Sequence, residues 1–114
     1  MDSSDDIGLV RKIGNKYNIE ILSEIQDRKT VGKVTESLDI PIATCYRRFD
    51  ELKEIGLVEE VGRTLSEKGG DVKLYRSKVS QIKINLNNDD IEIELEENKK
   101  EEKDHLAELW DDLK

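Results

Sequence analysis

The stretch that decides the fold is VTESLDIPIATCYRRFDELKEIGLV, residues 34–58. Its pattern predicts a short helix, a tight turn, and a longer helix over about residues 42–55 that stops at a glycine. Four residues of this stretch fall on one face at helical spacing, so we expect them to point toward the core: Cys45, Phe49, Leu52 and Gly56. The stretch therefore predicts two consecutive helices joined by a turn of about three or four residues.

The opposite face of the longer helix is small, polar and basic in its first turns and acidic at its far end. Ala43 and Arg47 lie opposite the core face, with Thr44 and Arg48 beside them. Only this N-terminal half could approach phosphates without repulsion, and it is the half that a recognition helix inserts into the DNA major groove. The same arginines could instead belong to an ordinary solvated surface, so the residues that follow must decide.

A basic hairpin is expected directly after these helices, over residues 57–79. Two strands flank a turn at Glu67-Lys68-Gly69-Gly70-Asp71. The residues expected to face inward are Val58, Val61, Leu65, Val72 and Leu74. The cations of the hairpin are Arg63, Lys68, Lys73 and Arg76. A hairpin in this position is a wing, which favours a DNA-binding helix over a merely solvated one.

Three segments carry a family resemblance: GNKYNIEIL at residues 14–22, IPIATCYRR at residues 40–48 and LKEIGLV at residues 52–58. Through them, residues 15–79 resemble a winged helix of the ArsR-type and related archaeal transcriptional regulators. The resemblance implies DNA contacts at the positions of Thr44, Tyr46, Arg47 and Arg48. Metal-sensing members of that family carry a Cys-x-Cys pair on the recognition helix, whereas this chain has one cysteine and one histidine, far apart. We therefore expect no metal and no other cofactor.

The acidic balance of the chain has to be reconciled with DNA binding. Its 114 residues carry a formal net charge of −8. All of this excess lies in residues 85–114, whereas residues 28–84 hold 12 basic and 9 acidic residues. DNA affinity depends on local positive charge rather than on total charge. The acidity weakens the DNA interpretation without excluding it.

Length and composition place the chain in the α+β class. We expect a winged helix-turn-helix domain over residues 1–80, followed by a β-hairpin and a short amphipathic helix over residues 81–114. No glycine-rich phosphate loop, Ser/His/Asp set or metal-ligand cluster indicates an enzyme. No segment approaches about 18 consecutive apolar residues, the N-terminus lacks a signal pattern, and the single Cys45 fits a reducing cytosol. The expectation is a cytoplasmic, non-enzymatic protein without a membrane segment.

Alternation of apolar residues fixes the register of the second hairpin, over residues 81–96. A two-residue turn at Asn88-Asp89, with positive φ, pairs residue 86 with 91, 84 with 93 and 82 with 95. One face then holds six apolar residues: Ile82, Ile84, Leu86, Ile91, Ile93 and Leu95. Because a lone hairpin is at best marginally stable, this face must cover something. It could extend the winged-helix sheet or pack on a second subunit.

The last residues predict a short helix with one apolar stripe, formed by Leu106, Leu109, Trp110 and Leu113. Such a short helix gains stability only by docking. Its own domain, a second subunit and a separate protein partner are the alternatives. Together with the hairpin face, this surplus of apolar surface predicts a homodimer built from residues 81–114.

Two functions of different classes follow. The first is a sequence-specific, double-stranded DNA-binding transcriptional regulator, with the recognition helix in the major groove and the wing on the backbone. Its expected DNA contacts are Thr30, Ala43, Thr44, Tyr46, Arg47, Arg48, Arg63, Lys68, Lys73 and Arg76. The alternative is a winged-helix protein-interaction module of the transcription machinery that uses its acidic tail. A continuous positive band from helix to wing would favour DNA, and interruption by Asp50, Glu67 and Asp71 would favour a protein.

Overall fold

The structure, a computed structural model, describes residues 3–99. Its helices are α1 (Ser3–Ile13), α2 (Lys16–Glu24), α3 (Val31–Leu38) and α4 (Ile42–Glu54). Two of them begin at side-chain caps. The carboxamide oxygen of Asn15 accepts a hydrogen bond from the Tyr17 amide, and the Thr30 hydroxyl accepts one from the Lys33 amide. The predicted C-terminal helix, with Leu106, Leu109, Trp110 and Leu113, lies outside the described residues.

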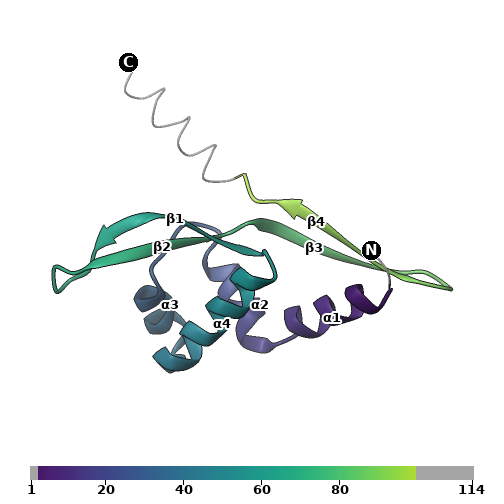
Figure 1. Ribbon diagram of the computed structural model, residues 1–114, viewed down its shortest axis with the longest axis horizontal. Helices are drawn as coiled ribbons and strands as arrows, with labels where there is room; N and C mark the ends of the chain where they lie inside the picture. Colours follow the sequence, from purple (N-terminus) through teal and green to yellow (C-terminus); the bar gives the residue numbers. More distant parts are fainter. Residues whose placement is uncertain (1–2, 100–114) are drawn as a thin grey trace, which may run out of the picture.

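Two antiparallel hairpins follow the helices and lie end to end. They are formed by β1 (Val58–Leu65) with β2 (Asp71–Ser77), and by β3 (Val79–Leu86) with β4 (Ile91–Glu97). All four helices lie on the same side of them, with α1 along the second hairpin and the other helices beneath the first (Figure 1). The two hairpins form separate two-stranded sheets. The second hairpin therefore does not extend the sheet of the first, which removes one of the two expected coverings of its apolar face.

The core is aliphatic and is built where the helices meet β1 and β2. It includes Ile21, Ile25, Val34, Ile40, Cys45, Phe49, Leu52, Leu57 and Val58. Ile40 fills the turn between α3 and α4, and Cys45, Phe49 and Leu52 confirm the predicted inner face of α4. Gly56 was wrongly placed on that face. It is exposed at φ 83°, where it ends the helix and turns the chain toward β1.

Tyr75 anchors the first hairpin to the helices. Its ring lies 5.2 Å from that of Phe49, centroid to centroid, and its backbone exchanges two hydrogen bonds with Lys29. Because strand residues alternate between faces, Leu74 and Val72 point away from Tyr75 and therefore away from the helices. The expectation that these two residues face inward was wrong. Leu65 is also misplaced, since it lies near the hairpin tip and is 72% exposed.

The expected register of the second hairpin is confirmed: Ile82 pairs with Leu95, Ile84 with Ile93 and Leu86 with Ile91. The expected turn conformation is not, because in residues 3–99 Asp39 is the one non-glycine residue with positive φ. Ile82 packs against the core, whereas the outer part of the apolar face stays open and Leu86 is 78% exposed. Burial of this face thus decreases along β3 from Ile82 to Leu86, whereas on β4 Ile91 and Ile93 are half-buried and Leu95 is 47% exposed.

A buried asparagine joins the end of β4 to the rest of the fold. The Asn98 carboxamide donates hydrogen bonds of 3.0 Å to the Gln26 carbonyl and 2.9 Å to the Ser77 carbonyl. Its backbone N–H donates to the carbonyl of Lys78, and its carbonyl accepts from the Arg76 guanidinium. The end of α2, the link between the hairpins and the end of β4 are thereby tied at one point.

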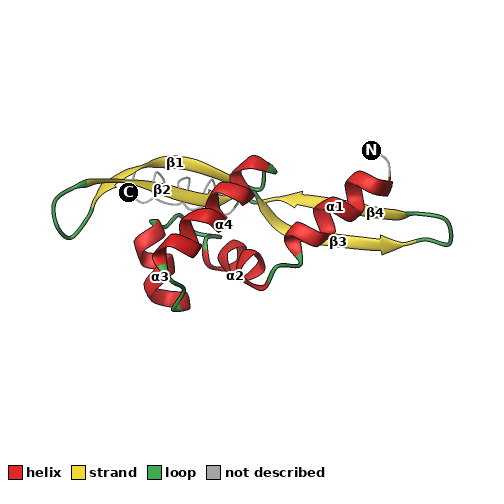
Figure 2. Cartoon of the chain, turned by 60° about the horizontal axis from the view of Figure 1, so that its bottom comes forward, coloured by secondary structure: helices red, strands yellow, loops and turns green. Residues whose placement is uncertain are grey.

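The architecture is α+β, a winged helix-turn-helix with an additional β-hairpin. In Figure 2 the helix-turn-helix pair α3 and α4 lies beside the first hairpin, and α1 crosses the second. None of the helices in residues 3–99 is both long enough and apolar enough to cross a membrane. The first hairpin occupies the position of a wing, so the helix-turn-helix and this hairpin are the place to look for a functional surface.

Candidate nucleic-acid interface

The turn between α3 and α4 sets the direction of the second helix. Asp39 caps α3 in the left-handed conformation, at φ 52° and ψ 47°. Its short polar side chain tolerates that conformation better than most. Pro41 then precedes α4 at φ −55° and provides no side-chain cap. Within residues 3–99, the first backbone N–H groups of α4 therefore have no side-chain acceptor, and they remain able to bind an anion.

The N-terminal half of α4 presents a mixed apolar and basic surface. Ile42 and Tyr46, one turn apart, are 54% and 52% exposed. Ala43 and Arg47, also one turn apart, form the neighbouring exposed row. The Arg47 guanidinium lies 3.4 Å from the Thr44 hydroxyl, and it has no ion-pair partner among residues 3–99. Arg47 is therefore the cation of this helix whose charge is least compensated.

Arg48, the second expected arginine of α4, is placed differently. Its guanidinium lies 2.9 Å from the carboxylate of Glu51, and both side chains are about three-quarters buried. Two other charged side chains of α4 follow, one acidic and one basic. Asp50 is exposed, and the Lys53 ammonium lies 5.5 Å from the ring centroid of Tyr75. Only one of the two expected arginines is thus presented outward without a carboxylate beside it.

The cations of the wing are mostly paired with carboxylates of the same hairpin. The Arg63 guanidinium lies 2.8 Å from Asp71, and the Lys73 ammonium lies 3.9 Å from Glu60. The neighbouring carboxylates raise the pKa of Arg63, and the largest contribution is its hydrogen bond to Asp71. Lys68, at the turn, has no ion-pair partner in the part of the chain that the structure describes. The positive band from helix to wing is therefore interrupted, as the sequence had left open.

Arg76 lies inside the fold rather than on an outer edge of the wing. Its guanidinium donates 2.6 and 2.8 Å hydrogen bonds to the carboxylate of Glu59 and to the carbonyl of Asn98. Its side chain is only 17% exposed. Arg76 thus holds the base of the two hairpins together, and its guanidinium points to protein atoms.

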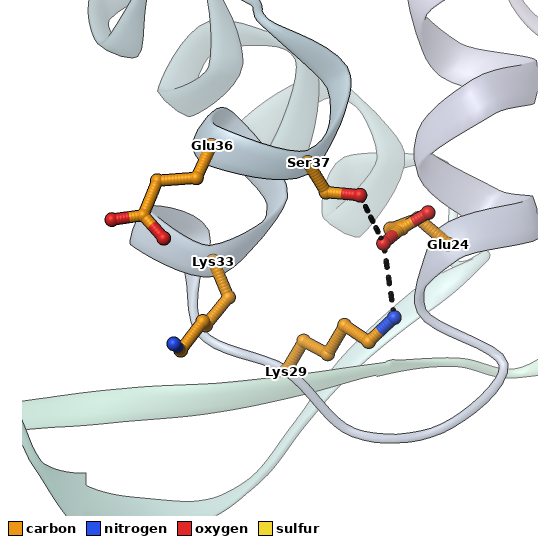
Figure 3. A pocket seen from close by; sticks show the side chains of 5 residues that line it. All are labelled: Glu24, Lys29, Lys33, Glu36 and Ser37. Atoms are coloured by element: carbon orange, nitrogen blue, oxygen red, sulfur yellow. Dashed lines mark hydrogen bonds and ion pairs between the residues drawn. The ribbon is translucent and has the colours of Figure 1, made fainter.

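A shallow pocket between α2 and α3 adds one cation that the sequence reasoning missed. It is lined by Glu24, Lys29, Lys33, Glu36 and Ser37. In Figure 3, the Glu24 carboxylate accepts hydrogen bonds from the Ser37 hydroxyl, at 2.6 Å, and from the Lys29 ammonium, at 3.0 Å. These hydrogen bonds lower the pKa of Glu24, and the bond from Ser37 has the larger effect. The Lys29 ammonium is thereby paired with the Glu24 carboxylate.

Lys33 also lines this pocket, in the first turn of α3, and has no ion-pair partner within residues 3–99. The signal that could have found it is its place three residues after the N-cap Thr30, where a side chain emerges beside the helix N-terminus. Among residues 3–99, Lys33, Arg47 and Lys68 are therefore the cations of α3, α4 and the wing that have neither an ion-pair partner nor a cation–π contact.

The remaining candidate groups give no reactive site in the described residues. Burial raises the pKa of the Cys45 thiol, which is enclosed in the core. No cluster of His, Cys, Asp and Glu side chains within residues 3–99 is arranged to hold a metal ion. The arrangement offers exposed cations, uncapped amides and apolar side chains, which are groups that can bind an anion or an apolar surface.

Comparison with known families finds a match in the same part of the molecule. Residues 13–61 match the model of a family described as a helix-turn-helix domain. The match runs from the end of α1 into β1 and contains α2, α3 and α4, so this region carries a helix-turn-helix domain. A search of curated proteins found none that matches the chain.

Proposed function

We propose that the protein is a sequence-specific, double-stranded DNA-binding transcriptional regulator of the ArsR-like winged-helix type. In this proposal the N-terminal half of α4 enters the major groove, and the wing follows the phosphate backbone. The observation that carries it is Arg47, whose guanidinium is exposed on that half and has no carboxylate partner among the described residues. A guanidinium in this position can donate two hydrogen bonds to O6 and N7 of guanine.

Phosphate contacts would surround this base contact. The uncapped amides at the start of α4 suit a phosphate, because they combine free N–H groups with the positive end of the helix dipole. Lys33 beside the Thr30-capped end of α3 and Lys68 at the wing tip provide unpaired ammonium groups. Lys73 and Arg63 contribute less, since each would have to leave a carboxylate first.

In the test of this proposal, the unmodified protein first selects its preferred sequence from a random DNA pool. The binding of two protein variants to this selected sequence and to random DNA is then compared. Arg47→Ala should lose roughly 1–3 kcal/mol of affinity for the selected sequence and relax the preference at one base position. Lys33→Ala should weaken selected and random DNA alike and reduce the salt dependence. Lys83→Ala is the control, because this exposed lysine lies on the second hairpin, beside Glu94. Binding that is unchanged by Arg47→Ala would refute a reading role for α4.

One observation favours the second candidate, a winged-helix module that binds another protein. The wing cations are largely neutralised by Glu60 and Asp71. The polar face of β4 presents Glu92, Glu94 and Glu96, all exposed. Such a surface suits a basic protein better than a phosphate backbone. Protein binding would be favoured over DNA binding if the unmodified protein retained no DNA from the pool even at low salt.

We also propose that residues 81–114 form a dimerisation element. Ile84, Leu86 and Leu95 of the hairpin face are 44%, 78% and 47% exposed, and contiguous apolar surface of this kind usually marks an interface. A twofold dimer would also supply paired recognition helices.

Sedimentation of the free protein tests the dimer. Ile84→Asp combined with Ile93→Asp should yield a monomer, whereas Asn87→Asp combined with Asn88→Asp at the exposed turn adds the same two negative charges and should not. A monomer at high micromolar concentration before any substitution would rule the dimer out.

A further inference from the structure

The outward surface of α4 contains an apolar row that a phosphate-binding helix does not need. Ile42 and Tyr46 form it, and each exposes more than half of its surface to solvent. Three other isoleucines of the helical region, Ile21, Ile25 and Ile40, are at most 3% exposed. Ile42 is not among the isoleucines that form the core, and it is left outside at the first residue of α4.

The neighbours of Ile42 restrict what it can meet. Ala43 beside it presents only a methyl group, and the amides of the same turn have no side-chain cap. Arg47, five residues further along, adds an uncompensated positive charge. An apolar side chain flanked by groups that favour phosphate points to an occupant that is anionic on its outside and apolar at one spot.

We infer that Ile42 recognises the 5-methyl group of thymine in the major groove. This inference rests on the proposed function, since it requires α4 to lie in that groove. The methyl group of thymine is the apolar feature that base pairs display there, and cytosine has none at the same position. Ile42 has no hydrogen-bonding side-chain atom, so it can distinguish bases only through this contact.

The geometry of an α-helix limits where the thymine lies. Ile42 and Arg47 are separated by five residues, or about 7.5 Å along the helix axis at 1.5 Å per residue. With base pairs about 3.4 Å apart, this spacing corresponds to roughly two steps. The selected DNA should therefore contain a thymine within about two base pairs of the guanine that Arg47 contacts.

Replacing thymine by uracil removes this methyl group and nothing else. Each thymine of the selected sequence is replaced in turn by deoxyuridine, and the affinity of the unmodified protein is measured. One buried methyl group is worth about 0.8 kcal/mol, so one or two replacements should weaken binding about fourfold. Cytosine in place of this thymine should weaken binding in the same way, because it lacks the methyl group. 5-Methylcytosine at the same position should restore most of the lost affinity.

Two protein variants show whether Ile42 is responsible. Ile42→Ala should bind thymine and uracil at that position equally well, while keeping its preference for the guanine. Ile19→Ala is the matched control, because Ile19 is a similarly exposed isoleucine, at 50%, on α2. This control should keep the fourfold preference for thymine.

The outcomes separate this inference from the proposed function. If thymine and uracil were equivalent at every position, or if Ile42→Ala kept the preference, the role of Ile42 would be refuted while DNA binding stood. If the protein selected no DNA from the pool, the proposed function would fail and the role of Ile42 with it.

Discussion

The two hairpins, β1–β2 and β3–β4, are similar in length and follow each other with only Lys78 between them, yet they are held in different ways. The first packs Val58 and Tyr75 into the core and gains Lys29 as a backbone partner beside β2. The second is buried at its base, at Val79, and becomes exposed toward Leu86. An isolated hairpin is marginally stable, so each hairpin depends on its contacts with the remainder of the molecule.

The same comparison holds for charge. In the first hairpin, lysine and arginine side chains face glutamate and aspartate side chains of the neighbouring strand, as in the Arg63–Asp71 pair. In the second, Lys83 has Glu94 opposite it, and the other glutamates of β4 are exposed. The first hairpin is therefore nearly neutral and can lie near DNA, whereas the second is acidic and is expected to stay away from it.

Loss of the Tyr75 ring should have the largest effect on this difference. Tyr75→Ala removes an aromatic side chain from the core, and we expect it to cost about 3–5 kcal/mol in the free energy of unfolding. Leu86→Ala, in the second hairpin, should change it by less than about 0.5 kcal/mol. Urea denaturation of both variants measures the two values. Equal losses would mean that the hairpins are anchored alike.

Asn98→Ala should come next, since it disconnects the junction that both hairpins share. The change leaves the carbonyls of Gln26 and Ser77 without their donor in a buried site. We expect a cost of roughly 2–4 kcal/mol in urea denaturation, from two unsatisfied carbonyl groups. Asn88→Ala, at the exposed turn of the second hairpin, serves as the control and should have almost no effect.

Arg76→Ala should lower stability by about 1–3 kcal/mol, because its bonds to Glu59 and Asn98 are largely shielded from water. Arg63→Ala should leave the urea midpoint nearly unchanged, since the Arg63–Asp71 pair is exposed to solvent and salt. Urea denaturation of both variants shows which of them has the lower midpoint. If Arg63→Ala were the more damaging, the pairs on the wing surface would contribute more than the pair at its base.

The smallest expected effect is a dependence on pH above about 10. Burial raises the pKa of Tyr75, so the neutral phenol is favoured in the folded state. This contribution to stability is complete below the pKa of the unfolded chain and is lost as the pH rises through the folded pKa. Tyr75→Phe should flatten the decline of stability at alkaline pH. A decline of the same steepness in this variant would assign it to other groups.

The sequence was sufficient where the periodicity of apolar residues determines the structure. The inner face of α4, from Cys45 to Leu52, and the pairing of Ile84 with Ile93 followed from spacing alone. The N-cap of α3 is equally local, because the hydroxyl of Thr30 needs only the amide of Lys33 nearby. These features depend on residues that are close in sequence or on a single repeated pattern.

The features that could not be predicted depend on contacts between distant residues. Leu74 was misplaced because the inward residue of that part of β2 is its neighbour Tyr75, which packs on the distant Phe49, and Leu65 because it lies near the hairpin tip and is 72% exposed. Arg76 could not be told from the surface cations of the wing, because its partner Glu59 lies 17 residues away in the chain. Asn98 gave no signal at all. Its partners are backbone carbonyls, which every residue possesses.

The position of Asn98 also bears on the order of folding. Its hydrogen bond to Gln26 closes a loop between residues 72 positions apart, and such closure is entropically costly until the intervening chain is ordered. The helices and the first hairpin can form their shorter-range contacts earlier, so we expect this bond to be absent from the transition state. Substitution of Asn98 should then leave the refolding rate unchanged and accelerate unfolding, with a φ-value near zero in stopped-flow measurements. On this basis Asn98 governs how long the native state persists rather than how quickly it is reached.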